Sequence, residues 1–98
     1  LMSAVNLAEV VGALARRGMA DEEAREVAAA LPVTVIAADA AMAIDAGLLR
    51  RLTEGAGLSL GDRFCLALAR RLRAPILTAD RAWRSVAEAA RVEIVLIR

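Results

Sequence analysis

The sequence has no histidine and no lysine, a single cysteine, and only two aromatic residues, Phe64 and Trp83. Without histidine, a His general base, a Ser-His triad and a His-containing metal site are excluded. Cys65 has no partner for an internal disulfide, which favours a reducing compartment, and we expect a cytoplasmic protein. With two aromatic side chains the chain offers no platform on which several bases can stack, so both are expected to be core or interface anchors.

Long hydrophobic runs are also missing. The longest uncharged run, residues 27–38, contains Pro32 and spans 12 residues, whereas a bilayer-spanning helix needs about 20. No membrane partner is therefore expected. Of the 98 residues, 59% are apolar, and 24 are alanine. This length and composition predict one soluble globular domain, residues 1–98, built from closely packed small-residue helices.

Neither sign of charge is in large excess, because the chain has 13 basic and 12 acidic residues. The net charge of +1 does not by itself predict a nucleic-acid partner. All the basic residues are arginine, whose planar guanidinium suits bidentate contacts with phosphate. A phosphate-binding role for a few of these arginines stays open.

Hydrophobic periodicity predicts short strands that alternate with helices. The expected strands are residues 1–4, 33–38, 75–79 and 93–97. Helices are expected from Asn6 to near Gly18, from Asp21 through Leu31, from Asp39 to Gly55, from Ser59 over LGDRFCLALARRL, and from Asp80 over RAWRSVAEAARV. The alternation predicts an α/β fold with a parallel sheet covered on both faces, whose ligands bind beyond the carboxyl ends of the strands.

Three acids occupy that position: Glu9, Asp62 and Asp80. Each has a purely structural interpretation. Asn6-x-x-Glu9 and Ser59-x-x-Asp62 both match a capping box, and Asp80 is a natural N-cap. The alternative is that the three carboxylates meet at one edge of the sheet. Their mutual repulsion would then be relieved by a hard divalent cation such as Mg²⁺, with Mn²⁺ as a substitute, and such an ion can activate water against a phosphate.

Three segments resemble, in order, the downstream acidic motifs of PIN-domain ribonucleases, especially VapC-like toxins of type II toxin–antitoxin systems. They are SAVNLAEV, GLSLGDRFCLALARRL and PILTADRAW. The resemblance covers nearly the whole chain. It implies a three-layer α/β/α domain, Mg²⁺-dependent cleavage of RNA, a cognate antitoxin as inhibitor, and a homodimer. By position, Glu9, Asp62 and Asp80 match the acidic residues of the family, with Asp62 the better metal ligand.

One part of the family pattern is missing from this sequence. The first acid of the family lies on an amino-terminal strand in a hydrophobic-Asp-[Ser/Thr]-[Ser/Ala] motif, and nothing before Leu1 supplies it. In the family that strand is central, so strands 1–4 and 75–79 would flank an empty position. We therefore expect a chain truncated at its amino end, as a fragment or a truncated gene product, or one half of an association in which another segment fills that position. The chain alone is expected to have a damaged metal site.

Three arginines lie beside the acids: Arg63, Arg81 and Arg84. They are candidates for holding RNA phosphates, although exposed arginines on a first helical turn commonly do no more than interact with solvent. Three interpretations of the chain remain: a PIN ribonuclease or its downstream part, an inactive PIN remnant that binds an antitoxin or its twin, and an unrelated α/β module in which the acids are caps.

Overall fold

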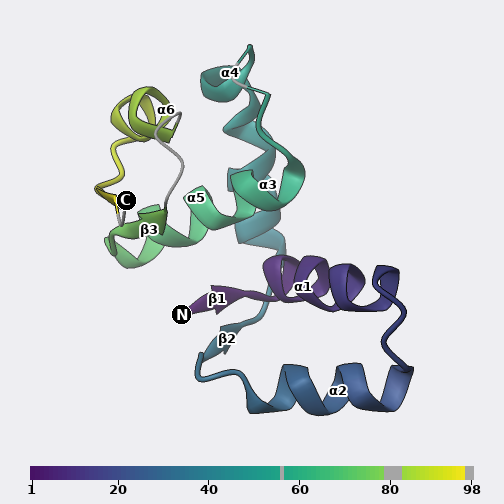
Figure 1. Cartoon of the computed structure of the whole chain (residues 1–98). Coiled ribbons are helices and arrows are strands. Elements are labelled where there is room, and N and C mark those ends of the chain that lie inside the picture. Colours follow the sequence, from purple (N-terminus) through teal and green to yellow (C-terminus); the bar gives the residue numbers. More distant parts are fainter. Residues whose placement is uncertain (56, 79–82, 97–98) are drawn as a thin grey trace. The chain divides into compact units, whose positions relative to one another are not determined.

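The computed structural model describes residues 1–55, 57–78 and 83–96. The chain divides into two compact units, which we call unit 1 (Leu1–Ala38) and unit 2 (Asp39–Arg98). Each unit contains helices and a two-stranded parallel sheet. The expected alternation of strands and helices is confirmed, and Figure 1 shows it along the chain.

Unit 1 consists of β1 (Met2–Ser3), α1 (Ala4–Arg16), α2 (Asp21–Ala30) and β2 (Val35–Ile36). β1 pairs in parallel with β2, with Met2 opposite Val35 and Ser3 opposite Ile36. Helix α1 contacts α2 and both strands. The two helices are joined by a turn at Gly18, whose φ of +92° suits glycine.

Helix α1 begins at Ala4, two residues before the start at Asn6 that the sequence pattern indicated. Its N-cap is Ser3, whose side chain accepts a hydrogen bond from the backbone N–H of Asn6 at 3.1 Å. Asn6 is therefore inside the helix and is not its cap. The hydrophobic spacing that begins at Leu7 could not reveal this start, because the first turn of α1 carries a different pattern.

Helix α2 ends at Ala30, one residue before the expected end. Leu31 is extended, with ψ of 132°, because it precedes Pro32 and the proline ring disfavours the helical conformation of the residue before it. Three acids in the first turn, Asp21, Glu22 and Glu23, stabilise the opposite end through the helix dipole.

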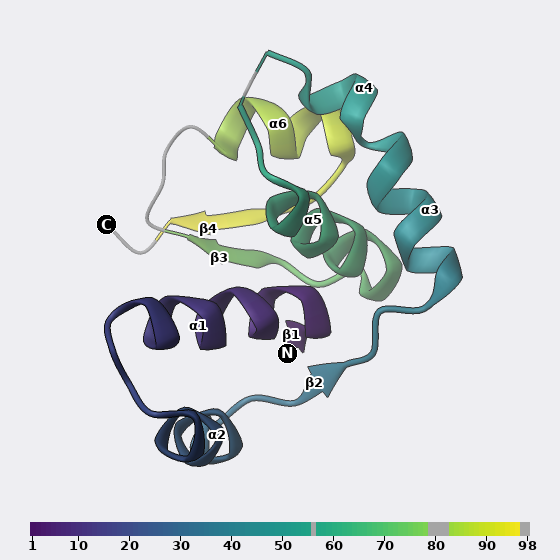
Figure 2. The ribbon, with the colours of Figure 1, turned by 90° about the vertical axis from the view of Figure 1, so that its right-hand side faces the viewer.

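Unit 2 contains α3 (Ala40–Leu48), α4 (Arg50–Thr53), α5 (Leu60–Leu72), β3 (Ile76–Thr78), α6 (Trp83–Ala90) and β4 (Ile94–Leu96). The strands β3 and β4 run parallel, with Ile76 opposite Ile94, and Figure 2 shows them side by side with their arrows in the same direction. Helix α5 contacts β3, α6 contacts β4, and α5 also packs on α3. The helix expected from Asp39 to Gly55 is divided in two at Leu49, which is the C-cap of α3.

The strands form two separate two-stranded sheets, where the sequence led us to expect one parallel sheet. The reason is that hydrophobic pattern shows where strands occur but not which strands pair. Each observed ladder joins strands within one unit, and all pairing is parallel as expected. The three-layer arrangement, and the absence of the central strand of the family between strands 1–4 and 75–79, stay predictions.

The buried apolar side chains lie mainly in unit 2. Both aromatic residues, Phe64 and Trp83, are buried there, as expected. The other large buried side chains of this core are Met42, Leu49, Leu66, Leu68, Ile76, Val86 and Val92. Cys65 is only partly buried. None of the described helices is both long enough and apolar enough to cross a bilayer.

Candidate functional site

Asp62 lies in the first turn of α5, and it takes part in a capping box. Its Oδ2 accepts a hydrogen bond from the backbone N–H of Ser59 at 3.0 Å, while its own N–H donates to the Ser59 hydroxyl at 3.1 Å. The cap predicted from the Ser59-x-x-Asp62 spacing is confirmed. The box uses one carboxylate oxygen, and Oδ1 accepts no hydrogen bond from any residue that the structure describes. Asp62 is thus a cap whose second oxygen is available to a ligand.

Glu9 lies in the middle of α1 and is exposed. Its Oε1 accepts a hydrogen bond from the Asn6 side-chain amide at 3.1 Å. The capping box expected for Asn6 and Glu9 is wrong, because Ser3 caps the helix and both residues lie beyond the N-cap. The Asn6 contact is one turn away along the helix, and it leaves Oε2 without a partner among the described residues.

The remaining candidates fall largely outside the described residues. Asp80 and Arg81 lie in the segment 79–82, and the side chain of Arg84 is likewise not described. Glu9 belongs to unit 1 and Asp62 to unit 2. The meeting of the three carboxylates therefore stays a prediction. Across residues 1–55, 57–78 and 83–96, no three His, Cys, Asp or Glu side chains form a group that could hold a metal ion.

Arg63, the residue after Asp62, lines a pocket of about 280 Å³ in unit 2. The other lining residues are Arg50, Thr53, Glu54, Gly55, Gly57 and Leu58. The Nε atom of Arg63 is buried and has no hydrogen-bond partner among the residues that the structure describes. A buried donor left without an acceptor costs about 1–3 kcal/mol, and more when it is charged.

Asp39 is a second acid at a helix start, where the sequence predicted a helix to begin. Its Oδ1 accepts a hydrogen bond from the backbone N–H of Met42 at 2.8 Å, so Asp39 is the N-cap of α3. The carboxylate also forms a bidentate ion pair with Arg71 of α5, at 3.0 and 3.1 Å. The hydrogen bonds from Arg71 and then from Met42 hold the pKa of Asp39 below its ordinary value. Both oxygens are engaged, so Asp39 is a structural link between α3 and α5.

A nuclease-type α/β domain is indicated by three features together: the motifs, the parallel strands and the acid at the start of α5. The PIN domain family matches residues 1–89. Because the match covers most of the chain, the chain belongs to the PIN domain family, whose members are generally nucleases. The matched range contains Glu9, Asp62 and Asp80. No curated protein and no solved structure matches the chain.

The structure also shows functional candidates that the sequence did not single out. Arg50 joins Arg63 in lining the pocket beside α5. Arg70, Arg73 and Arg91 line a different pocket, at the other end of that helix. The cluster RRLR at residues 70–73 was visible in the sequence, but nothing in the local pattern connects it to Arg91.

Proposed function

We propose that the chain is a VapC-like endoribonuclease domain that cleaves RNA phosphodiester bonds with Mg²⁺ as cofactor, and that a cognate antitoxin inhibits it. Family membership supports the nuclease part of the proposal. The observation that carries the site is the geometry of Asp62, whose backbone and Oδ2 are fixed by the capping box while Oδ1 is left available. A fixed carboxylate with an unused oxygen is suited to bind a cation without rearrangement.

The residues of the proposed metal site are Asp62, Asp80 and Glu9. The described donors fit a hard ion, because Asp62 Oδ1 and Glu9 Oε2 are both carboxylate oxygens without partners among the described residues. A chain without histidine also has no imidazole to draw a softer metal. When bound, the ion would activate the attacking water and neutralise charge on the phosphate.

The role of Arg63 in this proposal is to bind the RNA phosphate next to the scissile bond. Its position next to Asp62 and the pocket that it lines support this assignment. Arg81 and Arg84 are proposed as further phosphate contacts, because they follow Asp80 closely in the sequence. A guanidinium can donate two parallel hydrogen bonds to one phosphate, which positions the substrate as well as attracting it.

A second candidate function is an inactive module that binds an antitoxin or a second copy of the chain. Ile44 and Leu48 lie one turn apart on α3 and are 62% and 57% exposed, and Leu52 on the next helix, α4, is 46% exposed. We call these three residues the apolar stripe, and exposed apolar side chains of this kind favour a protein contact. A homodimer through this stripe is compatible with either function, so dimerisation alone does not separate them.

The experiment that tests the proposal compares Asp62→Asn with Ser59→Ala in the full chain. Asparagine keeps an oxygen that can accept from the Ser59 N–H but removes the negative charge. Ser59→Ala removes half of the capping box and keeps the carboxylate, at a cost of about 1 kcal/mol in the free energy of unfolding. If Asp62 binds the metal, Asp62→Asn abolishes the Mn²⁺ response in isothermal titration and slows Mg²⁺-dependent RNA cleavage at least about 100-fold.

Ser59→Ala is expected to keep both the metal response and the cleavage. If the two variants lose cleavage equally, in proportion to lost stability, Asp62 is only a cap and the site assignment fails. If the wild-type chain with Mg²⁺ leaves single-stranded and structured RNA uncut, the second candidate function replaces the first.

A further inference from the structure

A pocket of about 180 Å³ lies in unit 2, at the carboxyl ends of α5 and α6 and next to the amino ends of β3 and β4. It is lined by Ala69, Arg70, Arg73, Ala74, Arg91, Val92 and Glu93. Asp62 lies at the other end of α5. Eight residues separate Asp62 from Arg70, which is about 12 Å along a helix axis. This pocket is therefore distinct from the proposed metal site.

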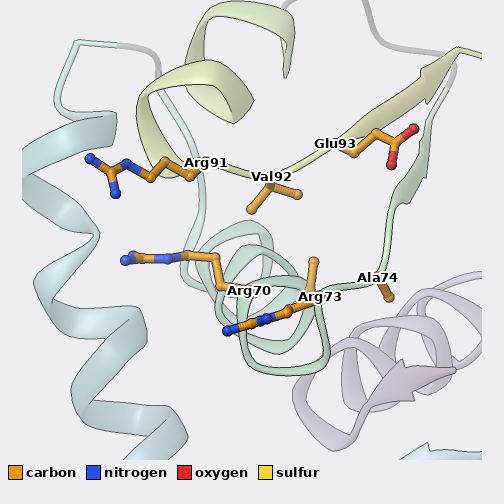
Figure 3. Close-up of a pocket in the computed structure, with 7 residues that line it drawn as sticks. Arg70, Arg73, Ala74, Arg91, Val92 and Glu93 are labelled. Atoms are coloured by element: carbon orange, nitrogen blue, oxygen red, sulfur yellow. The ribbon is translucent and has the colours of Figure 1, made fainter.

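Three arginines and one acid give the pocket its charge. In Figure 3 the guanidinium groups of Arg70, Arg73 and Arg91 extend toward the same side, whereas the carboxylate of Glu93 is directed away from them. The side chains of these three arginines make no hydrogen bond or ion pair with any residue in the described part of the chain. Asp45 is another carboxylate near Arg70, in an adjoining hollow, and it too has no bonded partner there.

The backbone of two of these arginines is unusual. Arg73 has a φ of 50° and Arg91 a φ of 58°, which is the left-handed region that glycine adopts most easily. The other described residues with positive φ are all glycines: Gly18, Gly55 and Gly57. The two positions where this sequence keeps a long charged side chain despite the unfavourable backbone thus line the same pocket.

Helix ends offer a simpler explanation for part of this arrangement. A cation near the last carbonyl groups of a helix is favourable, and Arg73 is the C-cap of α5. The same effect favours Arg70, which lies in the last turn of α5, so it explains why each position carries a positive charge. It does not explain why the two left-handed positions carry arginine and not glycine, nor why the three guanidinium groups extend toward one side of the same pocket.

We propose that the pocket formed by Arg70, Arg73 and Arg91 binds phosphate groups of an RNA strand, away from the site of cleavage. The proposal rests on the proposed nuclease function only in naming RNA as the source of the phosphate. Three guanidinium groups provide up to fifteen N–H donors and no acceptor, which matches the oxygens of phosphate. An RNA that contacts both the pocket and Asp62 spans more than one phosphate, because the two lie a helix length apart.

The test uses the double variant Arg73→Gly/Arg91→Gly, because glycine removes the charge and relieves the left-handed backbone. We therefore expect the thermal midpoint not to fall. Binding of a labelled single-stranded RNA is measured by fluorescence anisotropy in EDTA, where cleavage cannot occur, over a series of NaCl concentrations. If each arginine contacts one phosphate, the slope of log K against log [NaCl] becomes less negative by about 1.4, and affinity at about 0.1 M salt falls roughly 25-fold.

The matched control is Arg16→Gln/Arg25→Gln, which removes the same charge from exposed positions in unit 1. Arg70→Gln provides a second variant that leaves the left-handed positions unchanged, and it should make the slope less negative by about 0.7. An unchanged slope in the glycine variant, an equal loss in the control, or no binding of RNA by the wild-type chain overturns the proposal. The proposal is also overturned if the glycine variant loses binding of a polyglutamate peptide but keeps binding of RNA, because the pocket would then bind carboxylates of a protein.

The outcome is independent of the cleavage test. A chain that never cleaves RNA but binds it through these arginines contradicts the proposed function and supports this inference. If the wild-type chain cleaves RNA but the glycine variant has an unchanged salt slope, the proposed function is supported and this inference is contradicted.

Discussion

The two units of the chain differ most in how much they bury. In unit 1 the buried residues are Ser3 and Ala24, and α1 has none. In unit 2 the buried set includes whole apolar side chains on the three helices α3, α5 and α6, and Met42, Leu49 and Leu66 are almost completely inaccessible. Since burial of apolar surface is the main favourable term in folding, most of the stabilisation lies in unit 2.

The difference does not come from a lack of apolar residues in unit 1. Leu7, Val10, Val11 and Leu14 form a regular apolar face on α1, and all four are only partly buried. The partner helix α2 contributes mainly alanines, which cover little area. An amphipathic pattern therefore shows which face of a helix is apolar, but the size of the side chains opposite decides how much of that face is buried.

The largest effect is expected from shortening one leucine side chain in each unit to alanine. Leu66→Ala should lower the free energy of unfolding by about 3 kcal/mol, because the side chain is fully buried and its loss leaves a cavity. Leu14→Ala, a partly buried position on α1, should cost about 1 kcal/mol. Urea denaturation followed by circular dichroism measures both. Equal losses would show that unit 1 is as well packed as unit 2.

An intermediate effect is expected from the two serine caps. Ser3→Ala and Ser59→Ala each remove a hydroxyl that accepts from the backbone at 3.1 Å, at a cost of about 1 kcal/mol. By hydrogen exchange, the first should lower protection in α1 and the second in α5. Thr34→Ala is the matched control, because Thr34 is exposed and its hydroxyl bonds to no described residue. A similar loss in the control would contradict the capping explanation.

The smallest effect is expected from the ion pair between Asp39 and Arg71, which links α3 and α5 in unit 2. The folded pKa of Asp39 is lowered from 3.8. Its contribution to stability is therefore fully present above that value and is lost as the pH falls from 3.8 through the lower folded pKa. Arg71→Gln should raise the pKa of Asp39 toward 3.8, as measured by NMR titration of the carboxyl carbon. Arg51→Gln, another exposed arginine, should leave this pKa unchanged.

The local features of the fold were largely predictable. Asp39 and Ser59 were expected at helix starts, and each caps a helix through a bond three residues along the chain. Such bonds depend on spacing alone, so the sequence shows them directly. The start of α1 was missed because Ser3-x-x-Asn6 lies before the hydrophobic repeat, and the break at Leu49 was missed because Leu48 and Leu52 continue the apolar spacing.

The candidate site was predictable only in part. Asp62 was expected to be either a cap or a ligand, and the structure shows the cap with one oxygen left over. Apolar residues occur on two sides of α3, and Met42 and Leu49 are buried while Ile44 and Leu48 are exposed. Which of two apolar sides faces the core depends on the packing of α5 against α3, and that information lies elsewhere in the chain.

The sequence by itself determined where the helices and strands occur, which acids begin helices, and to which family the chain belongs. These follow from neighbouring residues or from motifs that are read along the chain. Only the tertiary structure decided which strands pair, how much of each apolar face is buried, and that Arg91 lines one pocket with Arg70 and Arg73. The physical reason is that these contacts join residues distant in sequence, whose approach is set by packing and not by local spacing.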